Sequence, residues 1–270
     1  MSPTERSAAE PAQEPTGDVD LVVRPATPDD AVELAELYLA TRRAAEPGMP
    51  PQVHTADEVR AYHRRVVAED EVWVAAGSDG SLLGYLVLQQ AWLHSLYVGP
   101  DHQGTGIGSV LLDLAKQHRP EGFSLWVFAS NAPARGFYRR HGLVELEHTD
   151  GSANEERSPD VRMAWPGIEP MAFLRGQIHA VDDELAVLLA RRQALTAAVQ
   201  GHKGRAGDRA GHAGRDPERE RAIAERMARH APGLGVDGIG RVVDAVISVS
   251  LDAWEKRRDT SAGGPGPEVG

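Results

Sequence analysis

The 270-residue chain contains no cysteine, which excludes a disulfide scaffold, a thiolate zinc site and a cysteine nucleophile. It also lacks a run of about 18 apolar residues, so we expect no membrane-spanning helix. The first 20 residues contain no apolar core of the kind that a signal peptide has. These absences favour a cytoplasmic protein without a membrane partner, and we identify no metal-ligand set.

Lysine is also scarce, since only Lys116, Lys203 and Lys256 are found among 29 basic residues. The net charge of −11 is unevenly distributed along the chain. Residues 1–166 carry 14 basic and 25 acidic residues, whereas residues 167–270 carry 15 of each. The acidic first part argues against a nucleic-acid partner.

The length predicts two domains, at roughly 100–200 residues per domain. Residues 1–19 are rich in Pro, Glu and Ala and predict a disordered tail. Residues 20–166 alternate strand-like and helix-like segments, and residues 167–259 have the pattern of an all-helical domain, interrupted by a glycine-rich stretch at 201–214. Residues 260–270 predict a second tail.

Hydrophobic patterns and turn residues predict the individual elements of the first domain. We expect strands at residues 19–24, 71–77, 82–89, 92–98, 124–128 and 161–165, and helices from residue 27, at 109–117 and at 132–141.

The second domain opens with a long amphipathic helix over residues 169–203. Its seam recurs at alternating spacings of three and four residues. The seam residues are Met171, Leu174, Ile178, Val181, Leu185, Leu188, Arg192, Leu195 and Val199. At 1.5 Å per residue this helix extends about 50 Å, which is too long to be covered within a domain of about 90 residues. We therefore expect a dimer of intertwined long helices.

Two shorter helices complete this domain. Asp216 predicts an N-cap followed by Pro217 at the first helical position. That helix is expected to end near His230. The last helix is expected to begin at a cap on Asp237 and to end near Arg258.

A glycine-rich loop follows the predicted strand at 92–98. Gly104, Gly106 and Gly108 lie between that strand and the next apolar helix. Glycines let backbone N–H groups approach a ligand closely, and a helix N-terminus favours an anion. The segment therefore predicts a pyrophosphate site. No lysine follows the glycines, so it is not a P-loop.

Two motifs in this domain resemble those of the GNAT family of N-acetyltransferases. The first is Gln103-x-x-Gly106-x-Gly108, and the second runs from Asn131 to Gly142. The resemblance covers residues 20–166 and implies an α+β fold with a mixed central sheet flanked by helices. It also implies acetyl-CoA as co-substrate and an amine as acceptor.

The resemblance further implies a role for each matching residue. Tyr138 would protonate the departing CoA thiolate, and Asn131 would help to seat the pantetheine arm. The edge of the strand at Leu96, Tyr97 and Val98 would pair with the same arm. The pyrophosphate would be held by the backbone of Gln103, Gly104, Thr105, Gly106, Ile107, Gly108 and Ser109.

The general base is less well defined. Period-two alternation would place Trp92, His94 and Leu96 on one face of their strand, unless a bulge intervenes. His94 is therefore a candidate base, although a structural role is the alternative. Glu71 and His63 are weaker candidates.

Arg192 interrupts the apolar seam of the long helix, and Lys203 points in nearly the same direction eleven residues later. An inward-facing Arg and Lys could bind a dianionic ligand. The alternative is that these cations pair with Glu184, Glu218 or Glu220.

The helical domain resembles the all-helical, AroQ-class chorismate mutases over residues 169–258. The resemblance rests on the segment from Leu174 to Asp182, on Leu188 to Arg192, and on Asp216-Pro-Glu-Arg-Glu220. It implies a three-helix fold, an intertwined dimer and a Claisen rearrangement of chorismate to prephenate that needs no cofactor.

The substrate-binding residues that this resemblance implies are Arg175 (from the partner subunit), Arg192, Lys203, Asp216, Arg219, Glu220, Ser250 and Trp254. Lys203 would contact the ether oxygen, Glu220 the ring hydroxyl, and Ser250 a carboxylate.

Two features depart from the mutase pattern. Trp254 stands where the family has Gln or Glu, and the loop at 204–214 is longer than usual. The sequence predicts a bifunctional acetyltransferase and chorismate mutase, acting on chorismate or a close analogue such as an amino analogue. The alternative is an acetyltransferase whose helical domain serves only for dimerisation or aromatic-ligand sensing.

Overall fold

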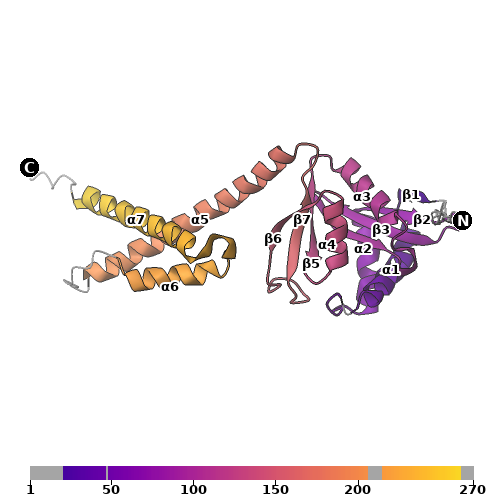
Figure 1. Ribbon diagram of the computed structural model, residues 1–270, viewed down its shortest axis with the longest axis horizontal. Coiled ribbons are helices and arrows are strands. Elements are labelled where there is room, and N and C mark those ends of the chain that lie inside the picture. The colour runs from indigo at the N-terminus through magenta and orange to yellow at the C-terminus, as the bar shows by residue number, and fades with distance from the viewer. Residues whose placement is uncertain (1–20, 47, 206–214, 263–270) are drawn as a thin grey trace, which may run out of the picture. The chain divides into compact units, whose positions relative to one another are not determined.

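The computed structural model describes residues 21–46, 48–205 and 215–262 (Figure 1). The chain divides into two compact units between Arg175 and Gly176, and we describe each by itself. The predicted tail at 1–19, most of the tail at 260–270 and most of the long loop at 204–214 lie outside the described residues.

The first unit is built on a seven-stranded sheet with the strand order β1-β2-β3-β4-β5-β7-β6. The strands are β1 (Val22–Pro25), β2 (Glu71–Ala76), β3 (Leu82–Gln89), β4 (Trp92–Val98), β5 (Phe123–Phe128), β6 (Val144–His148) and β7 (Asp160–Trp165). Neighbouring strands are antiparallel except β4 and β5, so the sheet is mixed, as predicted.

The parallel strands β4 and β5 are paired only near their amino ends. Trp92 is the residue of β4 that is paired with β5, opposite Ser124. Beyond that pair the two strands diverge toward their carboxyl ends. Their unpaired edges therefore face an opening in the middle of the sheet.

Two pairs of helices cover the sheet (Figure 1). α1 (Ala31–Ala44) and α2 (Ala56–Glu69) pack on one face, and α3 (Ile107–His118) and α4 (Ala132–Arg140) pack on the other. β3 lies between β2 and β4 and is buried on both faces. Its Tyr85 and Val87 belong to the core beneath α1 and α2, and its Leu86 and Leu88 belong to the core beneath α3 and α4. The helix pairs on the two faces of the sheet thus hold β3 and its neighbour β4 in place.

The elements predicted for the first domain are confirmed to within a few residues, but two elements were missed. α2 follows Thr55, whose hydroxyl accepts the Glu58 N–H (3.3 Å), while the Glu58 carboxylate accepts the Thr55 N–H (2.8 Å). This reciprocal cap was visible as a Thr-x-x-Glu pattern. β6 carries the Val-Glu-Leu-Glu alternation typical of a strand, but it is only five residues long and three of them are exposed, so it was missed.

The second unit is helical, as predicted. Its helices are α5 (Pro170–Arg205), which begins in the first unit, α6 (Pro217–Ala228) and α7 (Gly235–Ala262). Asp216 caps α6 by accepting the Arg219 N–H at 3.1 Å, which confirms that prediction. The cap predicted at Asp237 is wrong, since α7 begins at Gly235 and Asp237 lies in its first turn. None of the helices in the described ranges has the length and apolar character of a membrane span.

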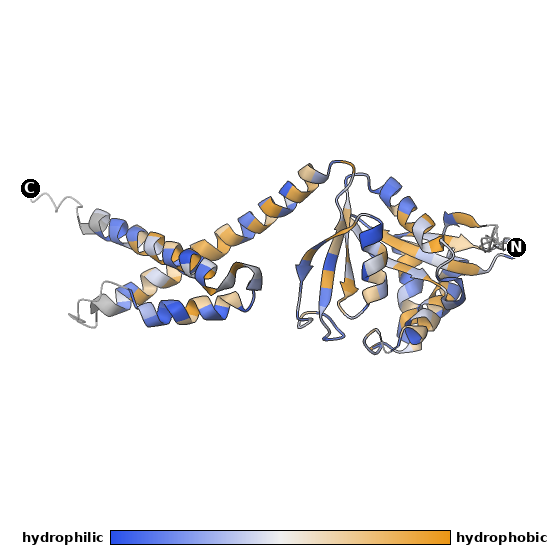
Figure 2. Ribbon diagram, viewed as in Figure 1, coloured by the Kyte–Doolittle hydropathy of each residue, from blue (hydrophilic) through white to orange (hydrophobic). Residues whose placement is uncertain are grey.

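Apolar residues recur along α5 (Figure 2), and the predicted seam that they form is largely exposed in the single chain. The buried cluster of this unit lies between α6 and α7 and consists of Ala224, Ala228, Ile239 and Val243. In contrast, seven seam residues of α5 are about half exposed or more: Met171, Ile178, Val181, Leu185, Leu188, Leu195 and Val199. An exposed apolar stripe of this length is unusual on the surface of a monomeric protein.

Candidate active sites

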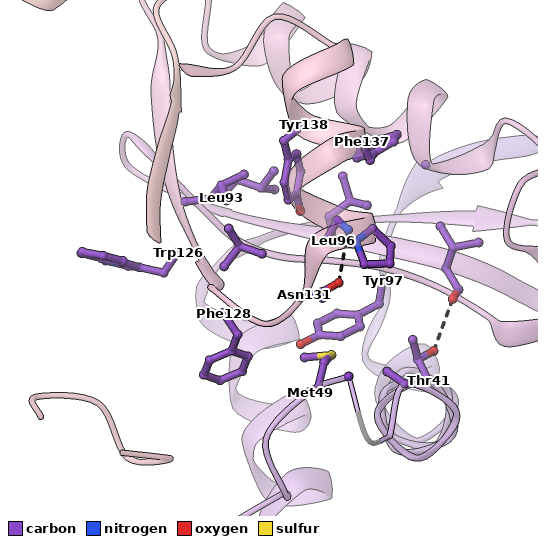
Figure 3. Close-up of a pocket in the computed structure, with 18 of the residues that line it drawn as sticks. Thr41, Met49, Leu93, Leu96, Tyr97, Trp126, Phe128, Asn131, Phe137 and Tyr138 are labelled. Carbon is purple, nitrogen blue, oxygen red and sulfur yellow. Dashed lines mark hydrogen bonds between the residues drawn. The ribbon is translucent and has the colours of Figure 1, made fainter. Parts of the chain in front are cut away.

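A pocket with a volume of about 1160 Å³ lies at the opening between β4 and β5 (Figure 3). It receives residues from α1, β4, β5, α4, the glycine-rich loop and the segment between β6 and β7. The predicted site residues that line it are His94, Leu96, Tyr97, Val98, Gln103, Gly104, Gly106, Gly108, Ser109, Asn131 and Tyr138. The fold thus gathers nearly the whole predicted acetyl-CoA site in one cavity.

Thr105 and Ile107 are the predicted residues that do not line the pocket. The Ile107 side chain is buried in the core beneath α3, so only its backbone is available to a ligand. The Thr105 hydroxyl donates to the His102 carbonyl at 2.6 Å and holds the loop in its turn.

The glycine-rich loop has a backbone that a side chain would strain. Gly104 and Gly106 have φ angles of 80° and 92°, in the left-handed region, and α3 begins directly after Gly106. A Cβ at Gly104 or Gly106 would meet no atom within 4 Å, so the backbone conformation is the reason for glycine there. The loop and the N-terminus of α3 therefore line the same pocket, an arrangement that suits a pyrophosphate.

Ser109 and His141 form a contact that the sequence reading missed. His141 Nδ1 lies 2.9 Å from the Phe137 carbonyl oxygen, which can only accept a hydrogen bond. In the neutral ring, Nδ1 therefore carries the proton and Nε2 accepts from the Ser109 hydroxyl at 2.9 Å. This contact ties α3 to α4 beside the glycine-rich loop, and His141 and Arg140 also line the pocket.

Tyr138 comes from α4 and is directed into the pocket (Figure 3). Its side chain is buried, and burial raises the pKa of the phenol above its ordinary value of 10. A phenol in this environment stays protonated at neutral pH. It can therefore act as a proton donor but not as a base.

Asn131 and Val98 have part of their hydrogen-bonding capacity used within the chain. The Asn131 side-chain oxygen accepts the Ala134 N–H at 3.2 Å and caps α4. The Val98 carbonyl accepts from Thr41 Oγ1 at 3.3 Å and from Gln103 Nε2 at 3.4 Å. These contacts fix the end of β4 and the start of α4 on the two sides of the pocket.

The predicted face of β4 is wrong at His94, because a bulge intervenes. Val87 of β3 pairs with Ser95, but the next residue, Leu88, pairs with Leu93. The bulge at His94 places Leu93, rather than His94, on the same side of the sheet as Leu96. His94 still lines the pocket and is exposed, so the bulge directs it toward the opening instead of a core.

The weaker base candidates, Glu71 and His63, do not line the pocket. The Glu71 carboxylate lies 2.7 Å from His118 and 2.8 Å from Arg119. Burial raises its pKa, but the hydrogen bonds from Trp73 and Arg119 and the nearby positive charges lower the pKa overall. His63 is buried, with Nε2 3.0 Å from the Tyr85 hydroxyl, and burial lowers its pKa. Both side chains have structural partners.

In the second unit the structure brings together two of the predicted substrate-binding residues. Arg192 of α5 donates to the Ser250 hydroxyl of α7 at 3.3 Å, and Ser250 in turn donates to the Val246 carbonyl at 2.6 Å. A smaller cavity of about 400 Å³ lies between the same two helices, lined by Leu189, Ala190, Gln193, Ala245, Val246, Val249 and Ser250.

Glu220 is paired with a residue that the sequence reading missed. Arg215 lies 2.6 Å from the Glu220 carboxylate, also contacts Asp244, and donates to the Ser248 hydroxyl at 3.1 Å. The Arg215 hydrogen bond lowers the pKa of Glu220. Glu220 is thus already engaged by a cation, although not by either of the cations considered from the sequence.

The other predicted residues of this unit are not gathered around a cavity. Arg175 and Arg219 are exposed. Trp254 is partly buried, with the Arg258 guanidinium 5.1 Å from its ring centre. Lys203 lies in α5, but its side chain is outside the described residues. Among the side chains that the structure describes, these residues do not enclose a pocket for a dicarboxylate.

Two parts of the chain match known protein families. Residues 33–143 match the acetyltransferase (GNAT) family, and residues 174–253 match chorismate mutase type II. The chain is a fusion of these two domains. The first match contains the glycine-rich loop and Tyr138, and the second contains Arg192 and Ser250.

Relatives of the GNAT domain come from several organisms. Peptidyl-lysine N-acetyltransferase YjaB of Escherichia coli is 26% identical over 145 residues, covering 54% of this chain and 97% of its own. Streptothricin acetyltransferase of Streptomyces lavendulae is 36% identical over 87 residues, covering 28% of this chain and 46% of its own. The solution structure of apo YjaB from Escherichia coli is 22% identical, with a TM-score of 0.47, and covers 54% of this chain and 98% of that one.

Proposed function

We propose that the protein is a homodimeric, cytoplasmic, bifunctional enzyme. Its GNAT domain transfers the acetyl group of acetyl-CoA to an amine. Its mutase domain rearranges chorismate, or a close analogue, to prephenate or the corresponding product in aromatic metabolism. The two domain matches support both activities.

The single observation that best supports acetyl transfer is the pocket between β4 and β5. It joins a left-handed glycine loop, the free edge of β4 and the buried phenol of Tyr138. In the proposed mode the loop binds the pyrophosphate, residues 96–98 and Asn131 hold the pantetheine arm, and Tyr138 protonates the thiolate. His94 remains the candidate base, acting directly or through water.

The names of the relatives indicate the acceptor class only broadly. One acts on peptidyl-lysine and another on streptothricin. We take from them that the acceptor of this chain is an amine. An arylamine or amino acid derived from an aminochorismate is an acceptor that would connect the two domains, and acetylation assays with such compounds test that connection.

For the mutase we propose that Arg192, Arg219 and Ser250 bind the substrate carboxylates, with Arg175 reaching over from the partner subunit. Lys203 would stabilise the charge that develops on the ether oxygen, and Glu220 would bind the ring hydroxyl. Asp216 and Trp254 complete the proposed set. In the reaction the ether C–O bond breaks as a C–C bond forms, so catalysis requires a compact substrate conformer and charge stabilisation.

The mutase proposal is tested by following chorismate consumption and prephenate formation with the purified full-length protein. Arg192→Ala should abolish turnover, because it removes a cation that binds a carboxylate. Arg191→Ala is the matched control, since Arg191 is the exposed neighbour on the same helix and should leave turnover intact. No prephenate from the unmodified protein would favour the dimerisation or ligand-sensing alternative.

A further inference from the structure

Glu156 is a carboxylate of the acetyltransferase pocket that the sequence reading did not single out. It lies in the segment between β6 and β7, and this segment lines the pocket together with the chain after α1, including Met49. The pyrophosphate loop and Tyr138 belong to other walls of the same cavity. Glu156 is thus available to a second ligand.

The position of Glu156 is fixed by a buried cation. Its carboxylate lies 3.7 Å from Arg42 Nη2, and the side chains of Arg42 and Glu156 are 4% and 21% exposed. Arg42 also donates to the Pro50 carbonyl at 3.0 Å, and its guanidinium lies 5.6 Å from the centre of the Phe128 ring. Arg42 does not itself line the pocket. A ligand therefore meets the carboxylate and not the cation behind it.

The segment that carries Glu156 is held by its own hydrogen bonds. Asn154 Nδ2 donates to the Ser158 carbonyl at 2.7 Å, and the Ser158 N–H donates to Asn154 Oδ1 at 3.1 Å. The Ser158 hydroxyl donates to the Glu156 carbonyl at 3.1 Å. The next residue, Arg157, adopts a left-handed backbone with φ 50°, which few residues other than glycine do. The turn therefore presents Glu156 in a defined direction.

One wall of the same pocket is apolar and aromatic (Figure 3). It is formed by Met49, Tyr97 and Phe128. Burial is the main cause that raises the pKa of the Tyr97 phenol, and smaller effects come from Tyr38, Arg42, Tyr138 and Glu156. Arg42 contacts both the Glu156 carboxylate and the Phe128 ring, and Glu156, Phe128 and Tyr97 line the same cavity, so the carboxylate and the aromatic wall border one space.

We propose that Glu156 is the specificity-determining residue for the acetyl acceptor, and that it selects a primary alkylammonium carried on an apolar or aromatic body. This inference rests on the proposed acetyltransferase function. The carboxylate pairs with the ammonium, while Phe128, Met49 and Tyr97 contact the apolar body. An acceptor that carries its own carboxylate beside the amine is disfavoured by like-charge repulsion. This preference argues against an amino acid derived from an aminochorismate as the main acceptor.

The transfer that follows is balanced. The ammonium loses one proton to solvent, and the amine nitrogen forms a bond to the thioester carbonyl carbon. The nitrogen loses its second proton as the C–S bond breaks, and the thiolate receives a proton from Tyr138. The proton lost from nitrogen restores the phenol through water. The products are the acetamide, CoA and one released proton.

The inference is tested with matched acceptors and full-length protein. 2-Phenylethylamine supplies the predicted cation and body, and phenylalanine adds a carboxylate to the same skeleton. Nα-Acetyl-lysine methylamide tests whether the same ammonium chemistry is supplied by a lysine side chain instead. We expect kcat/KM for 2-phenylethylamine to exceed that for phenylalanine by roughly tenfold or more, the scale of one charged contact.

The variant Glu156→Gln should lower kcat/KM for 2-phenylethylamine by roughly tenfold or more, through KM, and should abolish the preference over phenylalanine. Glu155→Gln is the matched control. Glu155 is the adjacent, exposed carboxylate and is engaged with His54 at 2.6 Å. Glu155→Gln should leave kcat/KM for 2-phenylethylamine and for phenylalanine within about twofold of the unmodified protein. KM for acetyl-CoA should be unchanged in both variants.

The possible outcomes distinguish a failure of the role of Glu156 from a failure of the proposed acetyltransferase function. Equal effects of the two variants, or a preference for phenylalanine, would overturn the role of Glu156. A protein that binds acetyl-CoA in a thermal-shift assay but acetylates none of the three probes would also overturn it, while leaving the acetyltransferase proposal standing. Faster turnover of the lysine probe than of 2-phenylethylamine would retain Glu156 and identify a lysine side chain as the source. Failure to bind acetyl-CoA would contradict the proposed function itself.

Discussion

Tyr138 illustrates how the surroundings of one side chain define its chemistry. The phenol is enclosed by the core beneath α4, and this burial holds its pKa above 10. A CoA thiolate needs a proton as it leaves, and an ordinary thiol has a pKa of about 8.5. A phenol that remains protonated at neutral pH and is directed into the pocket can supply that proton.

We therefore expect Tyr138→Phe to lower kcat for acetyl transfer by about 10²–10⁴-fold, the usual contribution of a positioned acid. The affinity for acetyl-CoA should stay unchanged, because the ring still fills the same space. Stopped-flow measurement of thiol release, with binding measured separately by calorimetry, checks both parts. Tyr62→Phe, at an exposed tyrosine outside the pocket, is the control. An equal loss in both variants would contradict the acid role.

Trp254 is the residue of the mutase domain that departs from its family pattern. Indole offers one N–H donor and occupies much more space than a Gln side chain. We expect Trp254→Gln to raise chorismate turnover by about 10²–10³-fold, the effect of one preorganised donor on a developing oxyanion. Prephenate formation measures this. Asp252→Asn, at an exposed position on α7, should change nothing. An unchanged rate in Trp254→Gln would indicate a pocket built for a different ligand.

At the scale of elements, the acetyltransferase site depends on the divergence of β4 from β5. A continuous parallel ladder would close the opening with backbone hydrogen bonds, but pairing stops at Trp92 and Ser124. The bulge at His94 adds to this by changing the register against β3. The glycine-rich loop then continues from the free end of β4 into α3, so three elements meet at one cavity.

Gly106→Ala should weaken acetyl-CoA binding by about tenfold, since a left-handed φ of 92° disfavours any Cβ by about 1–2 kcal/mol. The loop would relax away from the conformation that presents its N–H groups. Calorimetric titration with acetyl-CoA measures the change. Gly176→Ala is the control, because this glycine lies in α5 with open space around it. Unchanged affinity in Gly106→Ala would contradict the role of the loop.

At the scale of the whole molecule, the exposed seam of α5 is the outstanding feature. Burial of an apolar side chain contributes about 1.5–3 kcal/mol, and seven seam residues forgo much of this in a single chain. Arg192 already reaches Ser250 across α5 and α7. A second copy packed along α5 would cover the seam and bring the partner's Arg175 to the site, which is the proposed dimer.

The variants Leu188→Asp and Val187→Asp test whether the seam of α5 forms a dimer interface. Both side chains are well exposed in one chain, at 58% and 70%, so burial within the protomer predicts little effect from either. Only Leu188 lies on the seam. We expect Leu188→Asp to weaken dimerisation by about 100-fold or more, because it buries an unpaired charge, and Val187→Asp to have no effect. Sedimentation analysis over a range of concentrations measures this. Dimers that persist equally in both variants would contradict the seam as the interface.

The sequence alone determined features that depend on local signals. Gly104 and Gly106 specify a backbone that other residues avoid, and the three-and-four spacing along α5 specifies a long amphipathic helix. Asp216 with Pro217 specifies a helix start. Each of these signals acts over a few residues. The glycine-rich loop, the helix α5 and the start of α6 could therefore be predicted without knowledge of the rest of the chain.

The tertiary structure alone decided features that depend on residues far apart in the chain. The bulge at His94 arises from pairing with β3, and it invalidated a simple alternation along β4. The pairing of Glu156 with Arg42 joins residues more than 100 positions apart. Likewise Arg215 reaches Glu220 and α7 at once. Register and charge pairing depend on which elements become neighbours, and no local pattern encodes that choice.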